Sequence, residues 1–491
     1  MPSVPDTDAY ATWSQRVLAS LHLRSGSAAL ISVNAGSVER WSGTEFVAMT
    51  AGALDVLDAA GVAAGDDVPA LMASRPTSIA MMLAGAVSGR PLAPLAPRMT
   101  RRELLACLEN LSGGVLFADP DWMELATDLA ESTGRRAQII DGPTFSNRAV
   151  TANDNPHSVA MVMHTSGTTG LPKPVPVRES PLGHRADVNG LLLDLKLGDR
   201  LATAALFHHV GALGNIAVTL ANGATLVCFP DFSVDAWLSL ELVAPTHAVV
   251  VPSIIEILLA ADALTLPTLR VLGYGGSPIH PDTMRRVQTV MPGVDLVNLF
   301  GQTEGSPLTV LDAADHRAAA AGRTDLLRSA GRAAPGVELH IDHPGPDGVG
   351  EVWARCAHSF VTDGDGWQRT GDLGHLVDGY LYLVGRRGDK IIRGGENVFP
   401  LEVEQVLESH PEVREAGVVG VPDRRLGETV AAFIVPTDPA IPPSPQALHR
   451  YAREHLAGFK VPARWEFLEA LPRNPSGKIV RRELARRCAS Q

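Results

Sequence analysis

Residues 164–177, HTSGTTGLPKPVPV, combine hydroxyl side chains, glycines and a lysine within one short stretch. Backbone N–H groups of such a loop can surround an oxyanion, and its serine and threonine hydroxyls add further donors. A flexible linker has a similar composition, so the role depends on the motifs that accompany the loop. A Walker loop needs Gly-Lys-Ser/Thr in consecutive positions, whereas Lys173 lies three residues after Gly170. The stretch therefore predicts a phosphate-binding loop of a non-Walker type.

A second group of chemically capable residues stands in FGQTEG, residues 300–305. It offers an aromatic ring for stacking, a hydroxyl from Thr303 and a carboxylate from Glu304, which together suit a nucleoside and a magnesium ion. Upstream, the pair Gly275-Gly276 follows an apolar run, and glycines there allow a flat ligand to approach the backbone closely. These residues predict a nucleotide site.

Two adjacent histidines occur in LFHHVGALG, residues 206–214, before an expected glycine-rich turn and a helix-like run. A condensation-type HHxxxDG motif would require an acid at Leu213, so that class of acyltransferase is excluded. A serine esterase elbow, GxSxG, would need glycine at Ile279, so that class is disfavoured as well. His208 is left with two interpretations, a ligand-lining residue or a packed structural histidine.

The elements that position these residues alternate between strands and helices, which predicts α/β architecture with a largely parallel sheet. A strand at 159–163 delivers the phosphate loop at its carboxyl end, where open α/β sheets bind ligands. A helix is expected to stop at Gly89, and Thr100 with Glu103 forms a capping box for the next one. Other expected strands are 28–33, 114–117, 137–140, 248–252, 270–273 and 294–299, and helices are expected at about 8–23 and 43–60.

Composition excludes several classes of function. The 491 residues are 45% hydrophobic, enough for two or three domains, and the net charge of −12 is spread along the chain. Without a basic stripe no nucleic-acid partner is expected. Four widely separated cysteines indicate neither zinc nor disulfides, and hence a cytoplasmic protein. No targeting segment and no run of ~18 apolar residues is evident, so no membrane span is expected.

Three further stretches complete a specific set: TGDLG at 370–374, GYLYLVGRRGDKIIRGGENVFPLEVE at 379–404 and LPRNPSGKIVRREL at 471–484. With the phosphate loop and FGQTE, this chain resembles the adenylate-forming superfamily of acyl-CoA synthetases, stand-alone adenylation domains and beetle luciferases. The similarity runs from about Ser88 to the C-terminus.

The resemblance implies a large N-terminal domain of stacked α/β sheets plus a barrel-like part, at residues 1–385. A hinge at 386–389 would join it to a small, mobile α+β domain at 390–491. ATP with Mg²⁺ would convert a carboxylic acid to an acyl-AMP, from which the thiol of coenzyme A displaces AMP. A homodimer is a possible assembly.

The resemblance also assigns roles to individual positions. The residues that would bind the phosphates are Thr165, Ser166, Gly167, Thr168, Thr169, Gly170 and Lys173. The residues that would surround the nucleoside are Gly275, Gly276, Ser277, Asn298, Phe300 and Gly301, with Asn298 near the exocyclic amine of adenine. Thr303 would contact the α-phosphate, Glu304 would hold Mg²⁺, and Asp372 with Arg386 would bind the ribose hydroxyls.

Two further sets complete the assignment. Lys478 would bridge the carboxylate and the α-phosphate during adenylation, then withdraw as the small domain rotates. Arg393, Gly394, Gly395 and Glu396 would wall the pantetheine tunnel. His208, Val210, Gly211, Gly214 and Ser277 would line the acyl side. The expected catalytic residues are thus Lys478, Glu304, Thr303 and Thr165.

The sequence departs from the family pattern at three positions. Pro174 replaces a usual glycine and removes a donor at the rim of the phosphate loop. Phe300 replaces a tyrosine and keeps the stacking face without the hydroxyl. Gly388 replaces a usual Asp or Lys at the hinge and still permits rotation. These changes leave open a variant that mainly transfers the acyl group of a preformed acyl-AMP to coenzyme A.

The substrate side favours an uncharged acyl or aryl acid. Amino-acid-activating members usually carry an aspartate where His208 stands, and a buried ammonium without a counter-charge is costly. An acyl-CoA synthetase of fatty or aromatic acid metabolism is the leading hypothesis. The alternatives are an adenylating enzyme that loads a carrier protein and a non-catalytic nucleotide- or acyl-CoA-binding protein. The sequence does not identify the acid.

Overall fold

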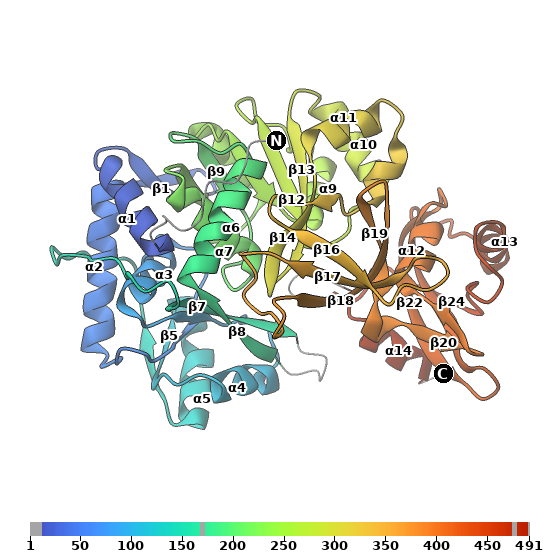
Figure 1. Ribbon diagram of the computed structural model, residues 1–491, viewed down its shortest axis with the longest axis horizontal. Coiled ribbons are helices and arrows are strands. Elements are labelled where there is room, and N and C mark those ends of the chain that lie inside the picture. Colours follow the sequence, from blue (N-terminus) through green and yellow to red (C-terminus); the bar gives the residue numbers. More distant parts are fainter. Residues whose placement is uncertain (1–11, 167–171, 474–478, 490–491) are drawn as a thin grey trace. The chain divides into compact units, whose positions relative to one another are not determined.

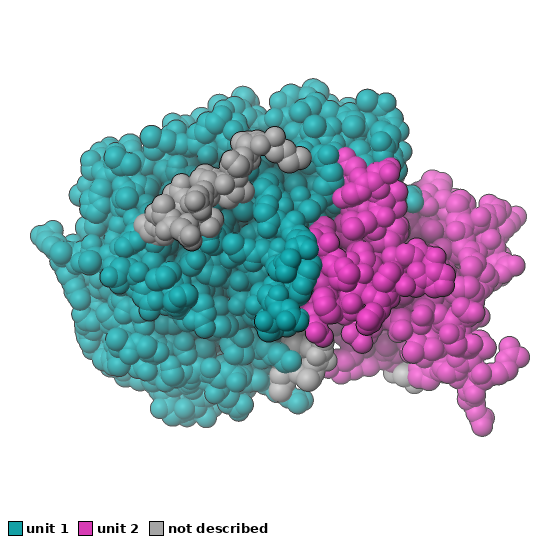
Figure 2. Space-filling model, in the orientation of Figure 1, with its two compact units in different colours: residues 1–338, 354–368 teal, residues 339–353, 369–491 magenta. Residues whose placement is uncertain are grey.

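A computed structural model describes residues 12–166, 172–473 and 479–489. The chain forms two compact units (Figure 2), of which unit 1 comprises residues 1–338 and 354–368 and unit 2 comprises 339–353 and 369–491. Both units mix helices and strands, and the expected mixed α/β class with a large and a small part is confirmed. The predicted hinge at 386–389 concerns a rotation and stays a prediction.

The first sheet of unit 1 is mostly parallel (Figure 1). Its central strands are short and mostly apolar. Its outer strands β2, β14 and β15 run antiparallel to their neighbours. In spatial order the strands are β15 (Arg332–Ala333), β14 (Gly305–Leu311), β13 (Asp295–Gln302), β12 (Val271–Gly275), β11 (His247–Val250), β9 (Arg200–Thr203), β10 (Thr225–Cys228), β1 (Ala28–Asn34) and β2 (Ser37–Ser42).

The second sheet of unit 1 is parallel except for its last strand. In spatial order its strands are β6 (Arg136–Ile139), β5 (Val115–Ala118), β3 (Val68–Leu71), β4 (Leu92–Pro94), β7 (Val159–Ser166) and β8 (Pro172–Arg178). Strand β8 lies at the edge and carries prolines at alternate positions 172, 174 and 176. Since proline has no N–H to donate, these residues suit an edge that no further strand extends.

Helices of unit 1 pack between and around these sheets. They are α1 (Trp13–Leu23), α2 (Gly43–Ala59), α3 (Pro76–Ser88), α4 (Arg101–Glu109), α5 (Met123–Thr133), α6 (Glu179–Leu192), α7 (Val210–Ala221), α8 (Val234–Leu238), α9 (Pro252–Ala260), α10 (Pro281–Val290) and α11 (Ala313–Ala320). Helix α6 contacts β8 of the second sheet and β14 of the first, and it packs along α7. One apolar core joins α1, α2, α3, α6 and α7 with strands of both sheets.

Local signals in the sequence placed several element boundaries correctly. Helix α3 ends before Gly89, which adopts the left-handed conformation at φ +64°. Helix α4 begins after Thr100, whose hydroxyl and backbone form the expected capping box with Glu103. Strand β13 extends through Phe300 to Gln302, further than the predicted end at Leu299. The extension follows from antiparallel pairing with β14, a tertiary contact that local pattern does not show.

Unit 2 contains most of four neighbouring strands and one sheet of its own. The four strands, in spatial order, are β16 (Glu338–Asp342), β17 (Gly350–Arg355), β18 (Gln368–Val377) and β19 (Tyr380–Arg386). The sheet comprises β21 (Glu396–Val398), β20 (Ile391–Arg393), β23 (Gly427–Pro436) and β22 (Val413–Asp423), with β24 (Arg464–Phe467) paired to β23. Helices α12 (Pro400–Glu408), α13 (Pro445–His455) and α14 (Arg481–Ala489) complete it. No helix among the described residues is long and apolar enough to cross a membrane.

The first residue of α6 predicts a pH dependence of stability. Glu179 is fully buried, its Oε2 accepts a hydrogen bond from the Ser14 backbone N–H at 2.9 Å, and burial raises the pKa of its carboxyl to about 7. The unfolded chain therefore loses this proton at a lower pH than the folded protein. Stability is lost as pH rises from about 4.5 to about 7, by about 3 kcal/mol in total.

Glu179→Gln removes this titration, so we expect the melting temperature of the variant, relative to the native protein, to rise between pH 5 and pH 8. Thermal melts at both pH values measure it. Half-buried Glu408, whose pKa is raised to about 8, acts in the same direction in both proteins and cancels in the difference. Glu124→Gln, at an exposed helix start, is the control and should show a constant difference. A Glu179→Gln difference that does not change with pH would contradict this assignment.

Candidate active site

The predicted phosphate loop lies between two paired strands. Strand β7 runs to Ser166 and β8 begins at Pro172, with Thr165 opposite Lys173 in the register. Residues 164–166 and 172–177 of the stretch are therefore paired strands rather than parts of a loop, and Lys173 belongs to a strand. The predicted phosphate ligands Gly167, Thr168, Thr169 and Gly170 lie outside the described residues.

His164, which precedes Thr165 on β7, was not singled out from the sequence. Neither ring nitrogen of His164 has a hydrogen-bond partner among the described residues, and burial lowers the pKa of this histidine to about 4. The ring is therefore neutral at physiological pH, with one N–H donor and one acceptor nitrogen unused. It stands beside Thr165 at the carboxyl end of β7.

The predicted nucleoside residues gather at the carboxyl ends of two adjacent parallel strands, β12 and β13. Gly275 pairs with Leu299, and a Cβ added at Gly275 would lie only 2.3 Å from the Leu299 carbonyl oxygen. Gly276 follows at φ +87°, a conformation that favours glycine. Asn298 donates from Nδ2 to the Tyr274 carbonyl at 3.5 Å, a long bond that leaves its amide oxygen available. A flat ring can approach the backbone here.

A buried hydrogen-bond chain fixes the end of β12. The Tyr274 hydroxyl lies 2.8 Å from Nε2 of His316, and Nδ1 of His316 lies 2.7 Å from the Asp312 carbonyl oxygen. A carbonyl only accepts, so Nδ1 carries the proton and Nε2 accepts from the tyrosine. Burial lowers the pKa of His316, which keeps the ring neutral. These hydrogen bonds connect β12 to α11, and no motif in the sequence predicted them.

The FGQTE segment ends β13 and turns into β14. The pairing of these strands is irregular between Phe300 and Gln302, and a Cβ at Gly301 would lie 2.6 Å from the Ser306 side chain. Glu304 is partly exposed and lies in the turn, where its backbone carbonyl accepts from the Phe360 N–H at 2.7 Å. The bulge and this bond set the position of Thr303 and Glu304, whose side chains are free of the strand pairing.

Glu304 could serve as the protein ligand of a nucleotide-bound magnesium ion, which needs few ligands from the protein. The described residues contain no cluster of three or more His, Cys, Asp or Glu side chains able to hold a metal ion. Magnesium bound to nucleotide phosphates keeps several waters and needs only one or two protein carboxylates. A single carboxylate at the end of β13 therefore fits this ion.

The predicted acyl residues lie at and within the start of α7. We expected Gly211 and Gly214 in a glycine-rich turn, but the helix begins at Val210 and contains both. His208 precedes the helix, its ring centroid is 4.6 Å from that of His209, and its Nε2 has no partner among the described residues. Burial, with smaller contributions from His209 and Arg98, lowers the pKa of His208 to about 3. His208 thus presents a neutral imidazole.

Asp372 and Arg386, the predicted ribose residues, pair within unit 2. They face each other across β18 and β19, and Nε of Arg386 donates to Oδ1 of Asp372 at 2.9 Å. Asp372 is 5% exposed, and its backbone N–H donates to the Thr370 hydroxyl. Gly371, at φ +69°, sets the local turn of the strand. The carboxylate is thereby held in one orientation.

The predicted pantetheine wall forms a tight hairpin in unit 2. Arg393 of β20 pairs with Glu396 of β21, and both intervening residues, Gly394 and Gly395, have positive φ. A two-residue hairpin of this kind requires φ above zero at both positions, which explains the two glycines independently of any ligand. Nη1 of Arg393 donates to the Phe459 carbonyl at 2.7 Å. Lys478 lies outside the described residues.

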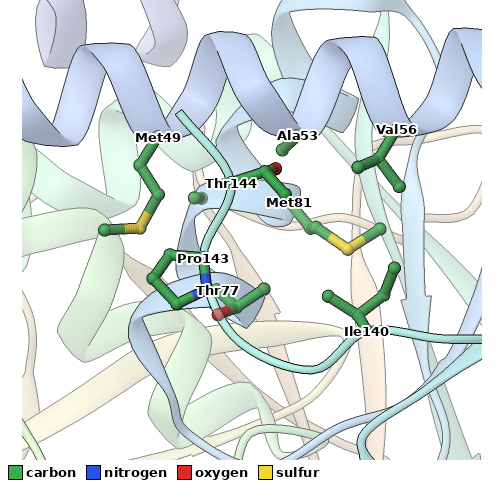
Figure 3. A pocket seen from close by; sticks show the side chains of 9 residues that line it. Met49, Ala53, Val56, Thr77, Met81, Ile140, Pro143 and Thr144 are labelled. Atoms are coloured by element: carbon green, nitrogen blue, oxygen red, sulfur yellow. The ribbon is translucent and has the colours of Figure 1, made fainter. Parts of the chain in front are cut away.

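Two cavities lie away from these residues and do not suit a substrate. One of about 10 Å³ lies among apolar side chains of α2, α3 and the segment 140–144, including Met49 and Met81 (Figure 3). It has room for about one water. Another, of about 280 Å³, is lined by Gly65, Gly89 and neighbours near the amino ends of β3 and β4. Ligands of open α/β sheets bind at the opposite, carboxyl ends.

Comparison with known proteins identifies the family. Residues 22–362 match the family described as AMP-binding enzyme, and residues 402–478 match the AMP-binding enzyme C-terminal domain. This chain belongs to the AMP-binding enzyme family. The match begins upstream of Ser88, where the sequence motifs were expected to start.

Individual relatives of this AMP-binding enzyme cover most of its length. It is 34% identical to the fatty acid–[acyl-carrier-protein] ligase ScoC of Streptomyces coeruleorubidus, over 87% of this chain and 88% of that protein. It is 33% identical to a feruloyl-CoA synthase of Amycolatopsis sp, over 88% and 90%. The solved amide bond synthetase McbA of Marinactinospora thermotolerans matches with a TM-score of 0.84 and 28% identity, over 97% and 99%.

This AMP-binding enzyme is an ATP-dependent, AMP-forming acid ligase, as expected from its motifs. The expected cofactors, ATP with Mg²⁺ and coenzyme A, agree with its relatives, which include a structure solved with ATP and magnesium. One of these relatives is named for a fatty acid and an acyl-carrier protein and another for feruloyl-CoA, so membership of the family by itself does not specify the acid or the acceptor.

Proposed function

We propose that this enzyme activates an acyl or aryl carboxylic acid without an ammonium group as its acyl-AMP and transfers the acyl group to coenzyme A. The observation that carries the proposal is the glycine cradle at the ends of β12 and β13. There the close approach of Gly275 to Leu299 excludes any side chain, and Asn298 stands next to it. Such a cradle suits the flat base of a nucleotide.

The acyl side supports an acid that lacks a cationic group. His208 stands at the start of α7 with a neutral ring, because burial lowers its pKa to about 3. A neutral imidazole provides no counter-charge for a buried ammonium, whose burial would cost several kcal/mol. The first turn of α7, with Val210 and Gly211, instead favours a negative group through the unpaired N–H groups of the helix start.

The residues of this chain have distinct tasks in the proposed reaction. Thr165 and Lys173, opposite each other on the hairpin, would bind the β- and γ-phosphates, and Thr303 would contact the α-phosphate. Glu304 would hold magnesium, which supplies charge neutralisation at the phosphates. Asp372 would accept hydrogen bonds from the ribose hydroxyls. Lys478 would place a positive charge between the carboxylate and the α-phosphate.

Two alternatives concern the acceptor and the first half-reaction. The similarity to ScoC, whose name states an acyl-carrier-protein acceptor, makes carrier loading a second candidate. Pro174, opposite His164 in the hairpin, lacks an N–H and leaves open a variant that mainly thioesterifies a preformed acyl-AMP. The proposed site of action is the cytoplasm.

Product analysis tests the proposal directly. The purified enzyme is incubated with ATP, Mg²⁺, a mixed library of fatty, aromatic and alicyclic acids, and either coenzyme A or a phosphopantetheinylated carrier protein. We expect mass spectrometry to show an acyl-CoA together with equal amounts of AMP and pyrophosphate. A reaction with preformed acyl-AMP in place of ATP identifies the thioesterifying variant. Absence of AMP and pyrophosphate across the whole library would contradict the proposal and revive a binding role without catalysis.

A further inference from the structure

Arg185 of α6 is a buried cation whose hydrogen bonds are incomplete. The residue is 3% exposed, and Nη2 donates to the Val210 carbonyl oxygen at 3.0 Å. Nε and Nη1 have no partner among the described residues. Since buried polar groups are almost always paired, a guanidinium with two unpaired nitrogens indicates that a partner is missing.

The surroundings of Arg185 contain no described carboxylate that could neutralise it. The Phe360 ring centroid lies 6.0 Å from its guanidinium carbon. The nearby titratable groups are histidines: His358 donates from Nε2 to the Pro307 carbonyl, and the proximity of Arg185 and His184 contributes to its lowered pKa. Burial lowers the pKa of Arg185 to about 10, so the guanidinium is still charged at neutral pH. The site therefore favours an anion or a strong oxygen acceptor.

Arg185 lies against the helix that carries the predicted acyl residues. Its bond to Val210 reaches the first turn of α7, and a Cβ added at Gly214 would lie 2.4 Å from Nη2. The guanidinium thus occupies the space that a side chain at position 214 would take. Two of the residues predicted to line the acyl side are in direct contact with this unpaired cation.

We infer that Arg185 binds an oxygen acceptor, a carboxylate or a phenol oxygen, at the end of the acid substrate remote from the carboxylate that is adenylated. This inference rests on the proposed function and narrows its substrate class. Position 208 holds a histidine instead of an aspartate, which argues against a cationic substrate. It does not argue against a substrate with a second carboxylate or a phenol oxygen. The N–H groups of Nε and Nη1 can each donate to a carboxylate or phenol oxygen, and such a bond is strengthened by the charge of the guanidinium.

Matched pairs of acids test the inference through pyrophosphate release. Heptanedioate is compared with heptanoate, and 3-(4-hydroxyphenyl)propanoate with 3-phenylpropanoate, so that the two arms distinguish a carboxylate from a phenol. We expect the native enzyme to favour the oxygen-bearing member of at least one pair by about tenfold or more in kcat/KM. Arg185→Met should lower kcat/KM for that member by about 10- to 100-fold, mainly through KM, and change its plain counterpart by less than about threefold.

Two further variants separate recognition from folding. Gly214→Ala inserts a methyl group where the guanidinium lies, so it should lower the same preference while Arg185 is still present. Arg24→Met is the matched control, because Arg24 is a buried arginine that bonds to the Ala224 carbonyl and the Thr225 hydroxyl. It should reduce thermal stability and leave the ratio of kcat/KM within each pair unchanged.

The outcomes distinguish this inference from the proposed function. Equal use of both members of each pair by the native enzyme, or an equal loss for both in Arg185→Met, would overturn the inference and leave the proposed function intact. Pyrophosphate release from none of the acids in the pairs or the library would overturn both. A loss confined to the oxygen-bearing acid in Arg185→Met and Gly214→Ala would establish the contact.

Discussion

Asp372→Ala is expected to lower ATP-dependent pyrophosphate release by about 1,000-fold. The buried carboxylate is oriented by Arg386 and would accept two hydrogen bonds from the ribose hydroxyls. Hydrogen bonds to a charged group contribute about 1.5–3 kcal/mol each, and 1.4 kcal/mol corresponds to a factor of ten. KM for ATP should rise most. Because AMP stays bound through both half-reactions, thioester formation from preformed acyl-AMP should slow as well.

Steady-state kinetics with varied ATP, together with the acyl-AMP assay, measure both effects. Glu338→Ala is the matched control, since Glu338 also pairs with an arginine, Arg355, through Nε at 3.1 Å. That pair is half-exposed, and such surface pairs contribute about 0–1 kcal/mol. The control should keep its activity. A native KM for ATP in Asp372→Ala, with an unchanged melting temperature, would remove Asp372 from the nucleotide site.

Lys478→Ala is expected to slow adenylation by about 100-fold while leaving thioester formation from preformed acyl-AMP within a few-fold of native. Loss of a single donor at developing charge costs roughly 3 kcal/mol. Lys478 itself lies outside the described residues, but residues on both sides of it make defined contacts. Arg473 forms an antiparallel β-bridge with Ile479. Arg481 forms an ion pair with Glu404 and donates to the Val418 carbonyl at 3.0 Å.

ATP–pyrophosphate exchange and thioesterification, measured separately, give the two rates for this variant. Lys460→Ala serves as the control, because Lys460 belongs to the same unit and pairs with Glu402 at 2.5 Å. It should leave both rates unchanged. A native exchange rate in Lys478→Ala would end its assignment as the catalytic lysine, and an equal loss in both half-reactions would indicate a structural role. Asp372→Ala should mainly raise KM for ATP, whereas Lys478→Ala should mainly slow adenylation. The two variants therefore distinguish loss of ATP binding from loss of catalysis.

Much of the fold was predictable because its signals are local. The capping box of Thr100 with Glu103 and the left-handed Gly89 both act within a few residues, and the structure has them where they were expected. The order of strands and helices likewise predicted a parallel sheet, which both sheets of unit 1 contain. The motif set predicted the family, since its residues recur in a fixed order along the chain.

Other features depended on contacts between distant segments. The composition of 164–177 predicts a loop, yet pairing with β7 makes Lys173 and Pro174 part of a strand. The glycines of LFHHVGALG predict a turn, yet Gly211 and Gly214 are helical. Gly394 and Gly395 were interpreted through a ligand, whereas the hairpin between β20 and β21 already requires them.

Arg185 illustrates the difference most clearly. Its spacing from Leu182, Ala186 and Asn189 places it on the buried face of α6, a signal that helical periodicity contains. Helical periodicity does not predict which element packs on that face, or whether a carboxylate there pairs with Arg185. Only packing of α6 on α7 showed a guanidinium against Gly214 with two nitrogens unpaired.

The sequence by itself determined the family, the adenylating chemistry and the residue types available for it, because these are encoded in short motifs and local conformational preferences. The tertiary structure alone decided which strands pair, which groups are buried without partners, and where the cation of Arg185 meets the acyl helix. Burial and pairing depend on residues far apart in the chain, so no local pattern contains them.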